Sequence, residues 1–412
     1  MASYPPFVPS AGRTSPEAAQ AARRARNHRS EFAIWWREID RVLLVLVLTL
    51  MAIGAVAVAA SSPASARRLS TSAVRLDDLH FFYIHLRWQV LGLIAMFGAS
   101  MLPRERARQA GILLGAAMLI ALMLVPVIGY SVNGAKRWIN LGFSLQPSEA
   151  LKPCFAIGIA WILSWRARDP KIPVIAISSG LMGMVGLFLM MQPDFGSSVL
   201  FAGVWFVMVL MCGIPVKRIA ALAGAGMAAV VLAYMFYENG RHRIDAFLGG
   251  GTAFDQVDLA QKTILAGGWT GTGLWLGTRK LGLPEAHTDY IFSVIGEEFG
   301  LLACAVIVAL YLALVLRVML RLLEEEDLFT TLAAAGLTAQ LGGQAFINIL
   351  VNLQLFPSKG MTLPLISYGG SSTIALCLGV GFLIAITRRN PFLKREGFSL
   401  RQVGLQKPGA GK

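Results

Sequence analysis

Charged residues are scarce in this chain. Only 15% of its 412 residues are Asp, Glu, Lys or Arg, with 23 acidic against 37 basic side chains. A soluble globular domain carries about 25% charged residues. Hydrophobic residues make up 56% of the sequence, and the mean hydropathy is +0.62. This composition excludes an ordinary soluble domain and is typical of a polytopic membrane protein.

Cysteine and histidine are scarce as well. The four cysteines lie far apart within apolar runs, without metal-ligand spacing: Cys154, Cys212, Cys304 and Cys377. This pattern predicts small core residues and argues against a disulfide framework or a zinc site. Of the five histidines, only His287 lies beside other candidate chemistry. The sequence GGWTGTGLWLG lacks a following GK[ST], which argues against an ATP site.

Long apolar runs are abundant. A membrane-spanning helix needs about 20 apolar residues. Ten runs qualify, at residues 42–61, 83–102, 110–130, 148–166, 173–191, 195–213, 217–237, 290–315, 331–352 and 370–387. Because the runs are continuously apolar and do not alternate, they indicate helices and not a barrel. The sequence predicts an all-α integral membrane protein with ten transmembrane helices in one domain, residues 42–387.

The positions of Lys and Arg predict the orientation. Roughly two thirds of them lie in segments on the same side as the N-terminus, which places both termini in the cytoplasm. Residues 1–41 are expected to form a disordered cytoplasmic tail before an uncleaved first span, and residues 388–412 a cytoplasmic C-terminal tail. The net charge of +14 then follows from topology and does not indicate nucleic-acid binding.

The external loops nevertheless contain basic residues, which predicts an anionic ligand on the outer face. They include Lys136 and Arg137 after the third run, Arg243, Lys262 and Lys280 in the segment 238–289, and Lys359 before the tenth run. Segments as long as 238–289 are usually functional or disordered. We expect this one to be folded against the membrane, with a short amphipathic helix near residues 255–265.

The sequence LPEAHTDYIFSVIGEE places Asp289 directly against an apolar run. Partial desolvation there would raise the pKa of the carboxyl group and make it a better general base. The alternative is that Thr288 or Asp289 caps the eighth span, where a carboxylate also favours the helix dipole. Glu297 and Glu298 follow two turns later, and at least one of them must face the bundle or a cavity.

Three more motifs place polar residues at the ends of the apolar runs. In QPSEALK, Glu149 and Lys152 are three residues apart and share a helix face, as a structural or functional ion pair. In QPDFG, Asp194 occupies a turn that needs no particular side chain. The stretch FPSKGMTLPLISYGGSS, which contains Lys359 and Ser371, is broken by prolines and glycines like a cavity-lining segment.

These motifs together resemble the SEDS family (shape, elongation, division and sporulation). GAKRWI, QPSEALK, QPDFG, LPEAHTDYIFSVIGEE and KGMTLPLISYGGSS occur in this order, and the resemblance covers residues 40–390. EAHTD followed by GEE is closer to the division members than to the elongation members. The resemblance implies polymerisation of lipid II into peptidoglycan strands at the outer face of the bacterial cytoplasmic (inner) membrane, at the division septum.

The resemblance also implies roles for residues. Asp289 matches the family's essential carboxylate and would act as general base on the acceptor hydroxyl, with inversion at the anomeric carbon. With the external cations, the candidate substrate-binding residues are Lys136, Arg137, Glu149, Lys152, Asp194, Arg243, Lys262, Lys280, His287, Lys359 and Ser371. No cofactor is required by this chemistry, and the use of a divalent cation, Mg²⁺ or Mn²⁺, stays an open alternative.

The partners that the resemblance implies are a cognate class B penicillin-binding protein and other division proteins, beside lipid II and membrane lipid. Two other functions stay open. A lipid II flippase would also have many helices, buried charges and broken segments. A scaffold could recruit division proteins through the basic tails.

Overall fold

The computed structural model describes residues 32–71, 74–132, 135–140, 142, 144–249, 254–357 and 360–389. The chain divides into two units, Met1–Ile39 with Arg388–Lys412, and Asp40–Thr387. Most of the two tails expected from the sequence lies outside the described residues. In the described part of the first unit, Arg388 donates a hydrogen bond to the Glu38 carboxylate at 2.7 Å.

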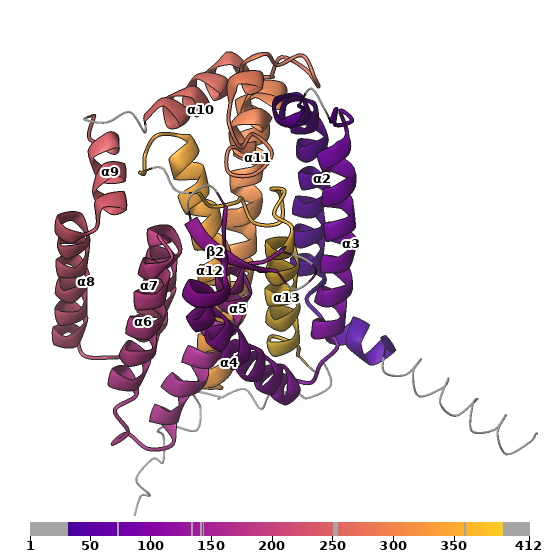
Figure 1. Ribbon diagram of the computed structural model, residues 1–412. Helices are drawn as coiled ribbons and strands as arrows, with labels where there is room; N and C mark the ends of the chain where they lie inside the picture. Colours follow the sequence, from indigo (N-terminus) through magenta and orange to yellow (C-terminus); the bar gives the residue numbers. More distant parts are fainter. Residues whose placement is uncertain are drawn as a thin grey trace, which may run out of the picture. The chain divides into compact units, whose positions relative to one another are not determined.

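The second unit is a bundle of helices (Figure 1). Its long helices are α2 (Arg41–Leu69), α3 (His80–Ser100), α4 (Arg104–Ile128), α5 (Pro147–Ser164), α6 (Val174–Met191), α7 (Phe195–Met211), α8 (Val216–Phe236), α11 (Ile291–Leu322), α12 (Leu328–Asn352) and α13 (Ser371–Ile386). A short 3-10 turn, η1 (Trp165–Ala167), follows α5. Each long helix overlaps one of the apolar runs in the sequence.

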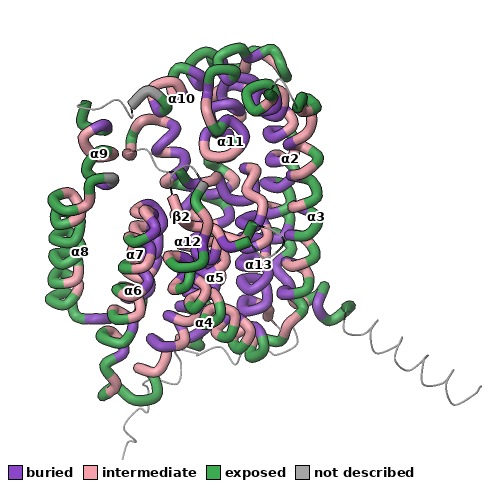
Figure 2. Tube along the Cα trace, in the orientation of Figure 1, coloured by how far each residue is buried: buried purple, intermediate pink, exposed green. Residues whose placement is uncertain are grey.

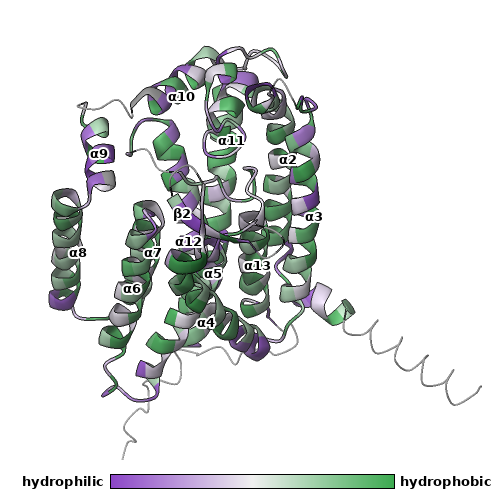
Figure 3. Cartoon of the chain, viewed as in Figure 1, coloured by the Kyte–Doolittle hydropathy of each residue, from purple (hydrophilic) through white to green (hydrophobic). Residues whose placement is uncertain are grey.

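Seven helices of the described chain are long and apolar enough to cross a membrane: α2, α3, α4, α6, α8, α11 and α12. Helices α7 and α13 are apolar but shorter, and α5 carries Glu149 and Lys152 near its start. Figure 3 shows hydrophobic residues along the helices and hydrophilic residues mainly at their ends and in the connections. The protein is therefore a helical membrane protein.

Helices α5, α12 and α13 form the most buried part of the bundle (Figure 2). Small residues allow α13 to approach its neighbours closely. A Cβ atom on Gly381 would lie 2.5 Å from the carbonyl oxygen of Met96 in α3, and one on Gly379 would lie 2.9 Å from the Cβ atom of Pro153 in α5. Such contacts are typical of helix packing in membranes, where close backbone approach replaces the hydrophobic driving force.

A small antiparallel sheet connects α4 to α5, so the expectation of an all-α fold was wrong for this segment. Its strands are β1 (Tyr130–Val132), β2 (Ala135–Asn140) and β3 (Ser144–Leu145), in the order β1-β2-β3. Strands of two to six residues are too short to show clear alternation in the sequence. Strand β2 carries both Lys136 and Arg137.

The segment between α8 and α11 contains helices α9 (Glu238–Phe247) and α10 (Phe254–Ala266) and the 3-10 turn η2 (Arg279–Gly282). The amphipathic helix expected near residues 255–265 is α10, which buries Val257, Ala260 and Ile264. Ile264 lies against Gly296 of α11. Helix α9 was not expected, because ENGRHRIDAF is mostly polar.

Helix α11 is broken at Gly300, where φ is 81° and ψ is 176°. Residues of the preceding segment lie in the break. The Thr272 amide donates to the Glu297 carbonyl at 2.9 Å, and the Leu301 amide donates to the Gly268 carbonyl at 3.0 Å. The segment thus satisfies backbone groups that the break in the helix would leave unpaired.

Candidate active site at the start of helix α11

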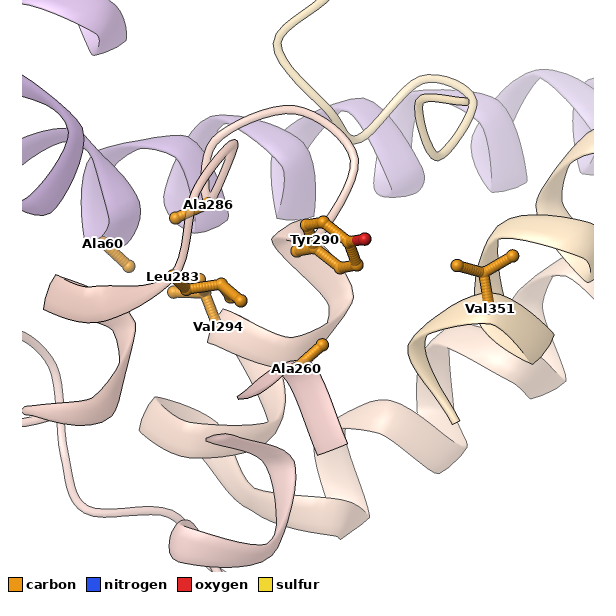
Figure 4. Packing of buried hydrophobic residues seen from close by; sticks show 7 residues of the cluster. All are labelled: Ala60, Ala260, Leu283, Ala286, Tyr290, Val294 and Val351. Carbon is orange, nitrogen blue, oxygen red and sulfur yellow. The ribbon is translucent and has the colours of Figure 1, made fainter. Parts of the chain in front are cut away.

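The segment before α11 is anchored on one side by apolar packing. Figure 4 shows Leu283, Ala286, Tyr290 and Val294 together with Ala60, Ala260 and Val351. The last three residues belong to α2, α10 and α12, so three helices contact the segment. Burial of this cluster fixes where the chain enters α11.

On the other side, the backbone carbonyls of the segment are held by residues that follow α12. The His287 carbonyl accepts a hydrogen bond from the Tyr368 amide at 3.0 Å, and the Thr288 carbonyl accepts one from the Ser367 hydroxyl at 2.6 Å. The Ser367 hydroxyl also accepts the Leu363 amide at 2.8 Å. The broken segment before α13 therefore packs directly beside the His-Thr-Asp sequence.

The Asp289 carbonyl is held by α12 itself. Asn348 donates to it through Nδ2 at 2.8 Å, and Asn352 does the same at 3.1 Å. Both Asn side chains are buried. Three consecutive carbonyl groups, at residues 287, 288 and 289, are thus each engaged by another part of the fold.

The Asp289 carboxylate does not cap α11, so the capping interpretation was wrong. The cap position is Tyr290, and no side chain there bonds to the helix amides. Among the described residues, none donates a hydrogen bond to this carboxylate. A Cβ atom on Gly360 would lie 3.2 Å from Asp289 Oδ2, so the backbone of residue 360 approaches the carboxylate closely. The carboxylate is held in place by its backbone and remains available for chemistry.

The surroundings of Asp289 raise its pKa to about 7. Desolvation is the main cause, and the negative charges of Glu285 and Glu149 add to it. Arg243 and Arg137 act in the opposite direction, because a nearby cation favours the carboxylate form. A carboxyl group with a pKa near neutrality is suited to general base catalysis.

His287 lies beside Asp289 in sequence but faces an aromatic cluster. Its Nδ1 is 2.8 Å from the hydroxyl oxygen of Ser65 in α2, and its ring lies 4.3 Å from that of Phe81 and 5.3 Å from that of Tyr368. Burial lowers the pKa of His287 to about 4, although the Glu285 charge opposes this shift. The imidazole is therefore neutral at physiological pH and holds the segment in place.

Glu149 and Lys152 form the ion pair expected from QPSEALK, with Nζ 2.6 Å from Oε1. Lys152 also donates to Gln344 of α12 at 3.3 Å, and Gln344 donates to the Thr362 carbonyl at 3.0 Å. The second carboxylate oxygen of Glu149 is buried without a hydrogen-bond partner among the described residues. Lys152 therefore links α5 to α12 and, through Gln344, to the segment that follows α12. The negative charge of Glu149 acts on Asp289.

Two of the expected external cations are bound to backbone carbonyls. Arg137 donates to the carbonyls of Gln192, at 2.9 Å, and Pro193. Lys136 donates to the Pro126 carbonyl at 3.0 Å. Arg137 therefore ties β2 to the connection between α6 and α7, while its charge still acts on Asp289.

The three cations of the segment 238–289 have different environments. Lys280 is buried and pairs with Glu298. Lys262 is largely exposed and pairs with Asp258 at 2.6 Å. Arg243, on α9, makes no hydrogen bond or ion pair with any residue that the structure describes, and its charge acts on Asp289. Of the three, Arg243 is the one whose charge acts on Asp289 without being paired to another described residue.

The remaining candidates are less directly connected to the site. Asp194 caps α7, where its carboxylate accepts hydrogen bonds from the Ser197 amide at 3.1 Å and hydroxyl at 2.8 Å. The Ser371 hydroxyl, at the start of α13, is buried without a hydrogen-bond partner among the described residues. Lys359 lies outside the described residues. The described chain contains no group of three or more His, Cys, Asp or Glu side chains that could hold a metal ion.

Sequence reasoning missed the polar side chains of α12. They recur at every fourth position and therefore share one helix face: Gln340, Gln344, Asn348 and Asn352. Amides at this spacing within an apolar run could have been noticed, because buried polar groups in a membrane need partners. The partners of the last three, which are the Asp289 carbonyl and the segment after α12, are visible only in the fold, whereas Gln340 Nε2 is buried without a hydrogen-bond partner among the described residues.

The fold and the site define a class of protein. It is a polytopic helical membrane protein with a partly buried carboxylate, which caps no helix, directly before one of its long helices. Residues 40–391 match the family described as cell cycle protein, which comprises FtsW, RodA and SpoVE. The chain belongs to this family.

Curated relatives match over most of their length. The chain is 34% identical over 369 residues to the probable peptidoglycan glycosyltransferase FtsW of Caulobacter vibrioides, which covers 89% of this chain and 94% of the relative. It is 37% identical over 361 residues to the protein of the same name from Hahella chejuensis, covering 84% and 90% of the two chains.

Solved structures share the fold. One is a chain from a structure described as "Structural coordination of polymerization and crosslinking by a peptidoglycan synthase complex". Its TM-score is 0.69 at 29% identity, and the match covers 85% of this chain and 97% of that chain. Another is the rod shape determining protein RodA of Thermus thermophilus, with a TM-score of 0.61 and 27% identity, covering 86% and 98%.

Proposed function

We propose that this protein is a peptidoglycan glycosyltransferase that polymerises lipid II into glycan strands. The observation that carries the proposal is the Asp289 carboxylate, which has a pKa of about 7, does not cap α11 and is held by its backbone beside a glycine. The names of the FtsW relatives support the same reaction class.

In the proposed reaction, Asp289 is the general base. It takes the proton of the acceptor sugar hydroxyl as that oxygen attacks the anomeric carbon of the donor lipid II. The bond from the anomeric carbon to the diphosphate breaks, and undecaprenyl diphosphate leaves with the bonding electrons. A single displacement inverts the anomeric centre. General base catalysis of this kind typically contributes about 10²- to 10⁴-fold in rate.

Negative charge develops on the diphosphate oxygen as the bond breaks, and a fixed cation in a site with little water stabilises it. Arg243 is the best placed of the described candidates, because it is near Asp289 and has no described hydrogen-bond or ion-pair partner. Arg137 and Lys152 contribute positive charge from positions fixed by the fold. No cofactor is needed, and adding EDTA to the assay tests whether Mg²⁺ or Mn²⁺ contributes.

The proposed setting is the bacterial cytoplasmic membrane at the division septum. All ten long helices would span the bilayer, with both tails in the cytoplasm and the segment 238–289 outside. The asymmetric distribution of Lys and Arg supports this orientation. The cognate partner would be a class B penicillin-binding protein, since a structural neighbour belongs to a complex described as coordinating polymerization with crosslinking.

The decisive experiment is polymerisation of lipid II by the purified protein with its cognate partner. We expect glycan polymer from wild type and none above background from Asp289→Asn. The matched control is Asp169→Asn, which changes an exposed carboxylate that accepts the Lys171 amide in a connecting turn, and it should polymerise normally. Translocation of lipid II without polymer would instead identify a flippase, and septal recruitment with neither activity would identify a scaffold.

A further inference from the structure

Helix α12 presents two buried carboxamides to the backbone of Asp289. Asn348 and Asn352 lie one turn apart, with 2% and 0% of their surface exposed. Their Nδ2 atoms lie 2.8 and 3.1 Å from the Asp289 carbonyl oxygen. A carbonyl oxygen has two lone pairs, so these two donors occupy both of them.

Each carboxamide has a second contact that fixes its orientation. Asn348 also donates to the Met361 carbonyl at 2.6 Å. Asn352 also donates to the Asn348 carbonyl at 2.9 Å, and its Oδ1 accepts the Ser293 hydroxyl at 2.7 Å. The amide groups therefore cannot rotate without breaking hydrogen bonds in a buried region, which makes the arrangement rigid.

Asn348 connects the two segments that flank the carboxylate. Its amide bridges Asp289 and Met361, and Gly360, adjacent to Met361, lies against Asp289 Oδ2. The same amide thus joins the backbone of Asp289 to the backbone of the segment that approaches its carboxylate. Loss of this bridge would loosen the two segments beside the carboxylate, while the Tyr368–His287 and Ser367–Thr288 hydrogen bonds would still join them.

We propose that Asn348 and Asn352 are positioning residues for the reaction, acting by fixing the Asp289 peptide plane and through it the carboxylate. This inference rests on the proposed function. Their contribution would appear in the catalytic step, because a displacement of about 1 Å of a reacting group can reduce the rate by about 10²-fold without changing substrate contacts.

The test uses the full-length protein with its partner and lipid II. Asn348→Leu and Asn352→Leu remove the amides and keep the side-chain volume roughly constant. We expect kcat to fall by about ten- to a hundredfold, with KM within about threefold of wild type. The matched control is Thr338→Val, also on α12, whose buried hydroxyl has no hydrogen-bond partner among the described residues, and its kcat should be unchanged.

Ser293→Ala covers the case in which the Asn variants fail to fold. It removes only the hydrogen bond that orients Asn352 and should lower kcat by about threefold or more, with KM retained. Unchanged kcat in folded Leu variants, or in Ser293→Ala where they do not fold, would overturn the inference while leaving an inactive Asp289→Asn, and hence the proposed function, intact. If Asp289→Asn polymerised lipid II like wild type, both would fall.

Discussion

The Lys280 ammonium group is paired with the Glu298 carboxylate, and their side chains are only 3% and 0% exposed. Lys280 also donates to the Ala60 carbonyl of α2 at 2.8 Å. The neighbouring Glu297 accepts the backbone amides of Arg279 and Lys280 at 2.7 and 2.9 Å. The two glutamates therefore fasten turn η2 to α11, close to the break at residue 300.

Removing one partner of this pair should destabilise the protein strongly. Lys280→Met leaves the Glu298 charge buried without its cation, which typically costs about 3–5 kcal/mol. The double variant Lys280→Met/Glu298→Leu removes both charges and should recover most of that loss. Thermal unfolding in detergent measures both effects. A single variant as stable as wild type would show that the pair is not buried in solution.

The break in α11 should require a glycine at position 300. Gly300 has φ of 81°, and a Cβ atom there would lie 2.3 Å from the Trp269 carbonyl oxygen. Gly300→Ala should therefore lower the free energy of unfolding by more than about 2 kcal/mol. Gly226→Ala in α8 is the control, because a Cβ atom there meets nothing within 4 Å. It should be neutral or slightly stabilising, and equal effects of the two changes would contradict the broken helix.

The pH dependence of polymerisation should follow Asp289. A general base is active when deprotonated, so the rate should rise with pH through the pKa of about 7. The negative charge of Glu285 contributes to raising that pKa. Glu285→Gln should therefore lower it and move the acid limb to lower pH. The shift should shrink in high salt, because Glu285 is exposed and its charge is screened. A limb that stays in place or moves upward would exclude this role for Glu285.

Asp194 should tolerate loss of its charge but not of its hydrogen bonds. Its carboxylate accepts both the amide and the hydroxyl of Ser197 at the start of α7. Asn is also a good N-cap, so Asp194→Asn should keep stability and polymerisation. Asp194→Ala should lose about 0.5–2 kcal/mol of stability. Thermal unfolding and the lipid II assay separate the outcomes: a stable but inactive Asp194→Asn would assign the charge to substrate binding.

Features that depend on a continuous stretch of chain could be predicted from the sequence. The apolar runs predicted the helices, because hydrophobicity over about 20 residues is a local property. The helix at residues 254–266 and the Glu149–Lys152 pair followed from helical spacing. The three-stranded sheet did not, because its strands are too short to leave a period in the sequence.

Features that join distant residues could not be predicted in this way. Lys280 was expected to face an external anion, yet the fold buries it against Glu298, 18 residues later. The segment that enters the break in α11 is Gly-rich, and glycines in a loop do not by themselves indicate which helix they approach. In both cases the contact partner depends on how the helices pack, and this packing cannot be read from the residues next to it in the sequence.

Asp289 shows most clearly what depends on the local sequence and what depends on the tertiary structure. The sequence alone determined that a carboxylate stands between a polar segment and an apolar helix, where desolvation raises its pKa. Whether that carboxylate caps the helix or stays available was decided by the tertiary structure. Asn348 and Asn352, 59 and 63 residues further along the chain, hold its carbonyl group. Because hydrogen bonds over such separations form only when the helices pack, the fold, and not the local sequence, decides that the Asp289 carboxylate caps no helix.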